Sequence, residues 1–286
     1  MNPALVLALG SAILYGAGDF TGGLTTRRAG TIPVVVFSQA SGLVLLALLL
    51  PFLPDASPSR QDWLWGAAAG LFGGVGVALL YRALAIGTMS VVAPTTAVCA
   101  VAIPVLAAII LGERPSSLAV AGIVVGVLSI VLVSLQSPGP EGASTSAGSR
   151  AGLGTALASG VAIGFFLLSF AQTGPAAGMW PLLAARFVSV GLFGLMAIGG
   201  RHQMKMPCSV FLLVVAAGIL DMMANALYLL AVRIGPLSVV ATLASLYPAS
   251  TVLLARVVLR ERLNPWQVGG VACALAAVIL IVRGSS

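Results

Sequence analysis

The chain has 286 residues, of which 59% are hydrophobic and only 7% are charged. A soluble domain carries about 25% charged residues, so this composition excludes an ordinary water-soluble protein and indicates an integral membrane protein. The formal net charge is +7, but the arginines stand at the ends of apolar runs, where positive charge orients helices and meets lipid headgroups. The expected partner is therefore a lipid bilayer, and no nucleic acid is expected.

Ten apolar segments follow one another along the chain, each near the ~20 residues that a helix needs to cross a bilayer. Strands are excluded because the apolar runs are continuous rather than alternating. The first segment lacks the basic start of a signal peptide, so we expect a retained helix. The predicted fold class is an all-α polytopic membrane protein with ten transmembrane helices at residues 3–20, 31–53, 63–83, 89–110, 118–135, 152–171, 178–199, 209–230, 237–259 and 267–283.

A linker rich in proline, glycine and serine separates five of these helices from the other five. We place the linker at residues 136–150, with a first five-helix repeat at 1–135 and a second one at 151–286. An odd number of helices in a repeat puts the two copies into the membrane in opposite orientations. The sequence therefore predicts two inverted five-helix repeats, with a binding site near the bilayer midplane between them.

The two halves also agree in sequence at one fixed offset of 148 positions, as from Gly87 to Gly235. The best matches join SVVA at Ser90 to SVVA at Ser238, and the Glu-Arg pair at Glu113 to the pair at Glu261. A run of matches at one offset indicates duplication.

Prolines and glycines interrupt several of the apolar segments. Pro94, Pro104 and Pro248 lie inside the fourth and ninth segments, where each removes a helical hydrogen bond and is expected to kink the helix. Kinks in two mirror-related helices would suit a gate. Glycines such as Gly66 and Gly70 in the third segment predict close helix packing, with hinge flexibility as the alternative.

The five-plus-five duplication, with SVVA and a Glu-Arg pair in each half, resembles the drug/metabolite transporter superfamily of the EamA type. The resemblance covers essentially the whole chain. It implies an exporter of amino acids and other small metabolites in a bacterial inner membrane. It also implies a cavity lined by the first, third and fourth helices and by their counterparts, the sixth, eighth and ninth.

Ionisable side chains inside a membrane span are costly and usually functional. Asp221 lies near the middle of the eighth segment, and Asn225 and Tyr228 follow at i+4 and i+7 on the same helical face. Arg186 lies ~12 Å deep in the seventh segment and Asp221 ~14 Å deep from the same side, at ~1.5 Å per residue. We therefore predict that the two side chains interact directly or through water. A structural ion pair and a role in gating or substrate binding both stay open.

Further candidates for contact with a substrate lie on the segments that should line the cavity. Asp19 ends a polar stripe of the first segment near its end, so an interfacial and a functional role are equally compatible with its position. All four tyrosines fall in cavity-lining spans, where they offer an apolar ring and a hydroxyl. Phe166 and Ser245 belong to the wider set of candidates. The predicted substrate-binding residues are Tyr15, Tyr81, Thr95, Thr96, Cys99, Phe165, Asp221, Asn225, Tyr228, Tyr247 and Ser250, and the predicted gating or ion-pair residues are Asp19, Arg186 and Asp221.

An enzymatic function is disfavoured, and no catalytic residue, metal or cofactor is expected. His202 is the single histidine, and the three cysteines form no CxxC motif. Gly70–Gly76 is rich in glycine but lacks the preceding strand of a nucleotide-binding loop.

The predicted function is a secondary transporter of small neutral or zwitterionic metabolites. Arg186 is the single deep cation, which disfavours phosphorylated substrates, whereas tyrosines, amides and one ion pair suit neutral and aromatic amino acids. Efflux of drugs or other metabolites is the alternative, and a membrane-embedded enzyme or scaffold is the second class. The expected partners are a small-molecule substrate and the bilayer, and a monomer is compatible with the sequence.

The distribution of basic residues bears on orientation. On the side opposite to the N-terminus, basic residues are more numerous, which favours that side as cytoplasmic, whereas the resemblance implies cytoplasmic termini. Orientation, coupling to protons and the identity of the metabolite stay open. The two sets are Arg27, Arg28, Arg82, Arg150, Arg201, Lys205, Arg256, Arg260 and Arg262 on the opposite side, and Arg60, Arg114, Arg233 and Arg283 on the N-terminal side.

Overall fold

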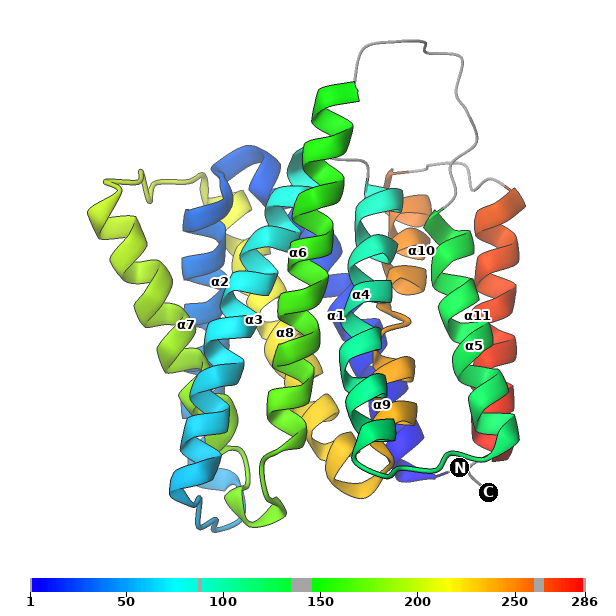
Figure 1. The fold of residues 1–286 in the computed structure, drawn as a ribbon. Helices are drawn as coiled ribbons and strands as arrows, with labels where there is room; N and C mark the ends of the chain where they lie inside the picture. The colour runs from blue at the N-terminus through cyan, green and yellow to red at the C-terminus, as the bar shows by residue number, and fades with distance from the viewer. Residues whose placement is uncertain (1, 87–88, 135–145, 260–264, 285–286) are drawn as a thin grey trace.

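A computed structural model describes residues 2–86, 89–134, 146–259 and 265–284, and every regular element in these ranges is a helix (Figure 1). Six described helices are long and apolar enough to cross a membrane, and four more are apolar but shorter. Together they form the ten spans that the sequence predicts. The first half contains α1 (Pro3–Ala29), α2 (Thr31–Leu49), η1 (Leu50–Phe52), α3 (Arg60–Ile86), α4 (Met89–Ile110) and α5 (Ser117–Ser134). The second half contains α6 (Ser146–Ala171), η2 (Pro175–Ala177), α7 (Trp180–Gly199), α8 (Cys208–Ile234), α9 (Leu237–Ala244), α10 (Tyr247–Leu259) and α11 (Pro265–Gly284).

The packing of the helices follows the predicted inverted repeat. α1 starts at the end of the bundle where both termini lie, and its counterpart α6 starts at the opposite end (Figure 1). α1 packs along α8. In the repeat α6 corresponds to α1 and α3 corresponds to α8, and α6 packs along α3 in the same way. α5 packs against its own counterpart α11, and α2 against its counterpart α7. Exchange of the two halves therefore maps the main helix contacts onto one another.

α1 and α6 extend furthest beyond their predicted ends. α1 continues to Ala29, past the predicted end at residue 20, and in this added stretch the hydroxyls of Thr25 and Thr26 donate to carbonyl oxygens of the preceding turn at 2.8–3.0 Å. The helix stops at Gly30, whose φ of 80° breaks the helical path. α6 begins at Ser146, so the last five residues of the predicted linker are helical, while residues 136–145 lie outside the described ranges.

The ninth predicted span is broken into two helices. α9 ends at Ala244 and α10 starts at Tyr247, so the break lies just before the predicted kink at Pro248. Pro248 stands in the first turn of α10, where a missing N–H costs no helical hydrogen bond. The mirror-related α4 continues as one α-helix through Pro94 and Pro104. The break therefore belongs to the second half and is not repeated in α4.

Glycines of α3 bring that helix close to two neighbours, as the sequence predicts. A Cβ atom added at Gly70 would lie 2.3 Å from the carbonyl oxygen of Ala185 in α7. One added at Gly76 would lie 2.8 Å from Ile163 in α6. Because backbone stands against backbone at Gly70, a side chain there would force α3 and α7 apart.

The repeated Glu-Arg and SVVA motifs meet in the structure. The Glu113 carboxylate, which follows α4, accepts hydrogen bonds from the backbone N–H of Ser238 at 3.1 Å and from its hydroxyl at 3.0 Å. Ser238 lies in the first turn of α9, so a residue of the first half caps a helix of the second half. The equivalent glutamate, Glu261, lies outside the described residues.

Candidate substrate-binding site

An internal cavity of about 700 Å³, part of it open to the surroundings, lies among α1, α2, α3, α6, α7, α8 and the break between α9 and α10. Small and aromatic side chains, among them Phe166 and Phe170, form its apolar walls. Its polar lining consists of Tyr15, Asp19, Gln39, Arg186, Ser189, Asp221, Asn225, Ser245 and Tyr247.

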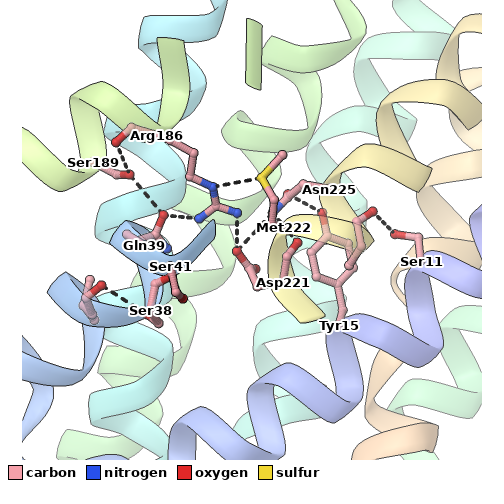
Figure 2. Close-up of polar contacts among 12 residues, drawn as sticks. Ser11, Tyr15, Ser38, Gln39, Ser41, Arg186, Ser189, Asp221, Met222 and Asn225 are labelled. Atoms are coloured by element: carbon pink, nitrogen blue, oxygen red, sulfur yellow. Dashed lines mark hydrogen bonds and ion pairs between the residues drawn. The ribbon is translucent and has the colours of Figure 1, made fainter. Parts of the chain in front are cut away.

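A buried ion pair lies at the polar side of this cavity (Figure 2). Arg186 Nη2 of α7 lies 2.5 Å from Asp221 Oδ2 of α8, and the two side chains are only 5% and 11% exposed. Arg186 also donates through Nη1 to Gln39 Oε1 of α2, and its Nε lies 3.4 Å from the Met222 sulfur. Each guanidinium nitrogen thus has a partner, which offsets the cost of placing the charge inside the bundle. The contact expected from the matching depths is present.

The hydrogen bonds continue from the ion pair to both sides (Figure 2). On one side, the Ser189 hydroxyl donates to Gln39 Oε1 at 3.0 Å. On the other side, Asn225 Nδ2 donates to Asp221 Oδ2 at 3.1 Å, and the Tyr15 hydroxyl donates to Asn225 Oδ1 at 2.6 Å. One network therefore joins α2, α7, α8 and α1 across the boundary between the two halves.

Asp19 adds a second carboxyl group to the cavity. Its side chain comes from α1 and is 7% exposed. Among the described residues it forms no hydrogen bond and no ion pair, because Arg186 is held by Asp221 and Gln39. A buried carboxyl without a partner is costly in its charged form, so Asp19 is suited to bind a proton or the cationic part of a ligand.

The break between α9 and α10 supplies two more polar groups. Ser245 and Tyr247 are buried, line the cavity, and have hydroxyl groups without a hydrogen-bond partner among the described residues. The rings of Tyr247 and Tyr15 meet edge to face, with centroids 6.5 Å apart. Buried hydroxyls are nearly always hydrogen-bonded in folded proteins, so these two are available to a polar ligand or to water.

Six of the predicted residues therefore line the cavity, namely Tyr15, Asp19, Arg186, Asp221, Asn225 and Tyr247. The other predicted tyrosines are buried elsewhere. The Tyr81 ring packs against Gly22 of α1, and the Tyr228 hydroxyl donates to the Leu167 carbonyl of α6 at 3.1 Å. Both tyrosines hold neighbouring helices together.

The remaining members of the predicted set also lie outside the cavity lining, whereas Phe166 and Ser245 of the wider set line it. The Thr96 hydroxyl donates to the Ala156 carbonyl at 3.2 Å and joins α4 to α6, where Cys99 stands against Gly160 and Thr95 is half-buried. The Ser250 hydroxyl donates to the Ala12 carbonyl at 3.0 Å and joins α10 to α1. Phe165 is 42% exposed on the outer face of α6, where it stacks on Phe72 with ring centroids 5.3 Å apart.

Gln39, Ser189 and Phe170 also line the cavity, although the sequence did not predict them as site residues. Gln39 carried a usable signal, since an amide in the middle of an apolar span needs partners inside the bundle. Ser189 and Phe170 carried none, because serine and phenylalanine are common on every face of such helices.

Comparison with known proteins agrees with this architecture. The model of the EamA-like transporter family matches the chain twice, over residues 2–135 and 150–283. A solved crystal structure aligns with 99% of this chain and 97% of its own, with a TM-score of 0.73 and 19% sequence identity, and it shows the same fold. No curated relative matches the chain by sequence.

Proposed function

The chain belongs to the EamA-like transporter family, and from its cavity we propose that it exports small neutral or zwitterionic metabolites, amino acids foremost, by alternating access. It is a multi-pass membrane transporter. We place it, as a monomer, in the inner membrane of the cell.

The observation that carries the proposal is the balance of charges in the cavity. Arg186 and Asp221 neutralise each other, whereas Asp19 and the hydroxyls of Ser245 and Tyr247 have no partner in the described part of the chain. An α-ammonium group fits Asp19, and the α-carboxylate of the same molecule fits the Arg186 side of the network by competing with Asp221. A phosphorylated solute would need further cations, because one paired arginine cannot replace its hydration.

The walls of the cavity support substrates with an apolar or aromatic side chain. Phe166 and Phe170 of α6 meet edge to face at 4.9 Å between ring centroids, and Tyr15 of α1 lines the same cavity. Aromatic rings favour such arrangements with a further ring. The apolar wall is therefore suited to the side chain of an aromatic or branched amino acid.

The position of the cavity supports alternating access. α1, α2 and α3 of the first half line it together with α6, α7, α8 and the α9–α10 break of the second. Rocking of one half against the other would open a site between inverted repeats first to one side of the membrane and then to the other. The hydrogen bonds from Ser189 to Gln39 and from Tyr15 to Asn225 cross this boundary and would have to rearrange.

Counterflow in liposomes tests the proposal. Purified protein in liposomes loaded with unlabelled amino acids should accumulate labelled tyrosine or leucine, saturably and in competition with the unlabelled solute. Asp19→Asn should weaken this uptake by roughly tenfold to a hundredfold, the value of a lost charge-assisted hydrogen bond. Cys208→Ser is the matched control, because Cys208 is exposed at the start of α8. Absence of counterflow across a broad panel, with monodisperse protein, would contradict the proposal.

Efflux of organic cations is the second candidate function, and Asp19 is the observation that favours it. An unpaired carboxyl beside aromatic rings also suits a substrate with an amine and no carboxylate. Tyrosine and tyramine separate the two functions, because they differ by the carboxylate alone. Transport of tyramine in preference to tyrosine would show that Arg186 does not recognise a carboxylate and would replace the amino-acid proposal.

A further inference from the structure

A second hollow lies between α2, α3 and α7. It reaches the end of α3 and the start of α2, which lie opposite to the two termini (Figure 1). It encloses about 1410 Å³, including open space, and shares no lining residue with the internal cavity. Along α3 it extends from Leu71 to Arg82, a distance of roughly 16 Å at ~1.5 Å per residue. We call it the α3–α7 groove.

The walls of the α3–α7 groove are apolar over most of its length. Leu71, Val75 and Leu79 form one stripe of α3 at helical spacing, and Leu192 and Met196 face it from α7. Leu71 and Met196 are each 46% exposed, so neither is covered by protein. On a membrane-spanning surface an uncovered apolar groove of this kind takes up an acyl chain.

One end of the groove is polar and basic. Arg82 at the end of α3 and His202 and Gln203 after α7 complete the lining there, and all three side chains are exposed. Arg82 forms no ion pair with any described residue. Its guanidinium is therefore free to bind an anion near the end of α3.

Among the residues that the structure describes, the charged side chains around this end are all basic. The exposed cation Arg28 lies in the last turn of α1, and the exposed cations Arg201 and Lys205 lie in the α7–α8 connection. Within the described ranges, the acidic residues outside the cavity are Asp55, Asp62 and Glu113, and all of them lie in elements at the opposite end of the bundle. A basic site above an apolar groove is complementary to an anionic headgroup attached to an acyl chain.

We propose that the α3–α7 groove binds one anionic phospholipid. Its phosphate lies at Arg82 and His202, and one acyl chain lies along the stripe from Leu71 to Leu79. Because Gly70 and Gly74 of the same helix line the transport cavity, a bound lipid would support α3 from its outer face. The site is independent of the transported substrate.

Native mass spectrometry of the whole protein in mild detergent tests the site, with phosphatidylglycerol and phosphatidylcholine of the same acyl chains as probes. The wild type should retain one phosphatidylglycerol about fivefold more than phosphatidylcholine, since a basic residue near an anionic surface contributes about that factor. Arg82→Gln should abolish the preference. Arg60→Gln is the matched control, because Arg60 is exposed at the other end of α3.

Two further arms keep the test decisive. Val75→Trp should reduce retention of both lipids by filling the groove, while size-exclusion chromatography shows that the variant is folded. Inorganic phosphate at matched concentration should leave phosphatidylglycerol bound. Equal retention of the two lipids by the wild type, an equal loss in Arg60→Gln, or displacement by inorganic phosphate would overturn the proposal.

Discussion

The ion pair between Arg186 and Asp221 should make the stabilities of α7 and α8 depend on each other. Asp221→Asn keeps the shape of the side chain but leaves the Arg186 charge, on a side chain that is 5% exposed, without a counterion. Loss of one partner of a buried pair costs about 3–5 kcal/mol. Arg186→Gln should cost less, because the Asp221 carboxyl group keeps the hydrogen bond from Asn225. The double variant buries no charge of the pair.

The two losses should therefore not add. The free energy of unfolding of the double variant should be well above the value obtained by subtracting both single losses from that of the wild type. We expect a coupling of at least about 2 kcal/mol between the two positions. Thermal unfolding of the purified protein in one detergent, at one scan rate, gives the midpoints of the four proteins. At roughly 2–4 °C per kcal/mol, Asp221→Asn should lower the midpoint by roughly 6–20 °C, and the double variant should recover part of that loss.

Asp221→Asn combined with Cys208→Ser is the control for additivity, because Cys208 is exposed near the start of α8 and far along it from the pair. Losses at these two positions should simply add. If the losses of Arg186→Gln and Asp221→Asn also add, the two charges do not stabilise each other and the reasoning from burial is wrong. Counterflow by a folded double variant then separates the roles: full activity identifies a structural pair, and loss of activity identifies a role in transport.

Three further predictions follow from the packing. Gly70→Ala should lower the unfolding midpoint by several degrees and reduce transport, because the added Cβ atom meets the backbone of α7. Gly191→Ala is the control: Gly191 has open space around it, so neither the midpoint nor transport should change. Glu113→Gln should destabilise the start of α9 by about 1 kcal/mol, the value of a helix cap, and hydrogen exchange should increase at Ser238 while distant helices are unaffected. Tyr15→Phe should cost about 1 kcal/mol of stability and raise the KM of counterflow more than it lowers kcat; an unchanged KM would place Tyr15 outside the substrate contact.

Much of the fold could be predicted because the length and hydropathy of each segment determine which residues cross the bilayer and how deep each residue lies in it. Ten apolar runs of the right length gave ten spans, and depth alone brought Arg186 and Asp221 to the same level. The contact between them needed no knowledge of how the helices are rotated. Buried charges are rare and costly, so two at one depth have few alternatives to pairing.

The rotation of each helix about its axis could not be predicted in the same way. In a helix of a soluble protein, an apolar stripe marks the buried face. In a membrane helix the lipid-facing and the protein-facing sides are both apolar, so the sequence pattern does not distinguish them. Tyr81 and Tyr228 consequently lie on the predicted helices yet outside the cavity, and Phe165 lies on the exposed face beside Phe166, which lines it. The position of Gln39 opposite Arg186 depends on the rotation of α2.

The contact between Glu113 and Ser238 has a consequence for how a chain of this kind can arise. Its two partners belong to motifs that each half carries, and among the described residues they meet across the two halves. A separate five-helix unit would therefore find its partner for this contact in a second, antiparallel copy of itself, and symmetry would provide the contact twice. Gene fusion would convert that dimer into one chain without a new interface. Each half could then change on its own, as the broken span in the second half illustrates.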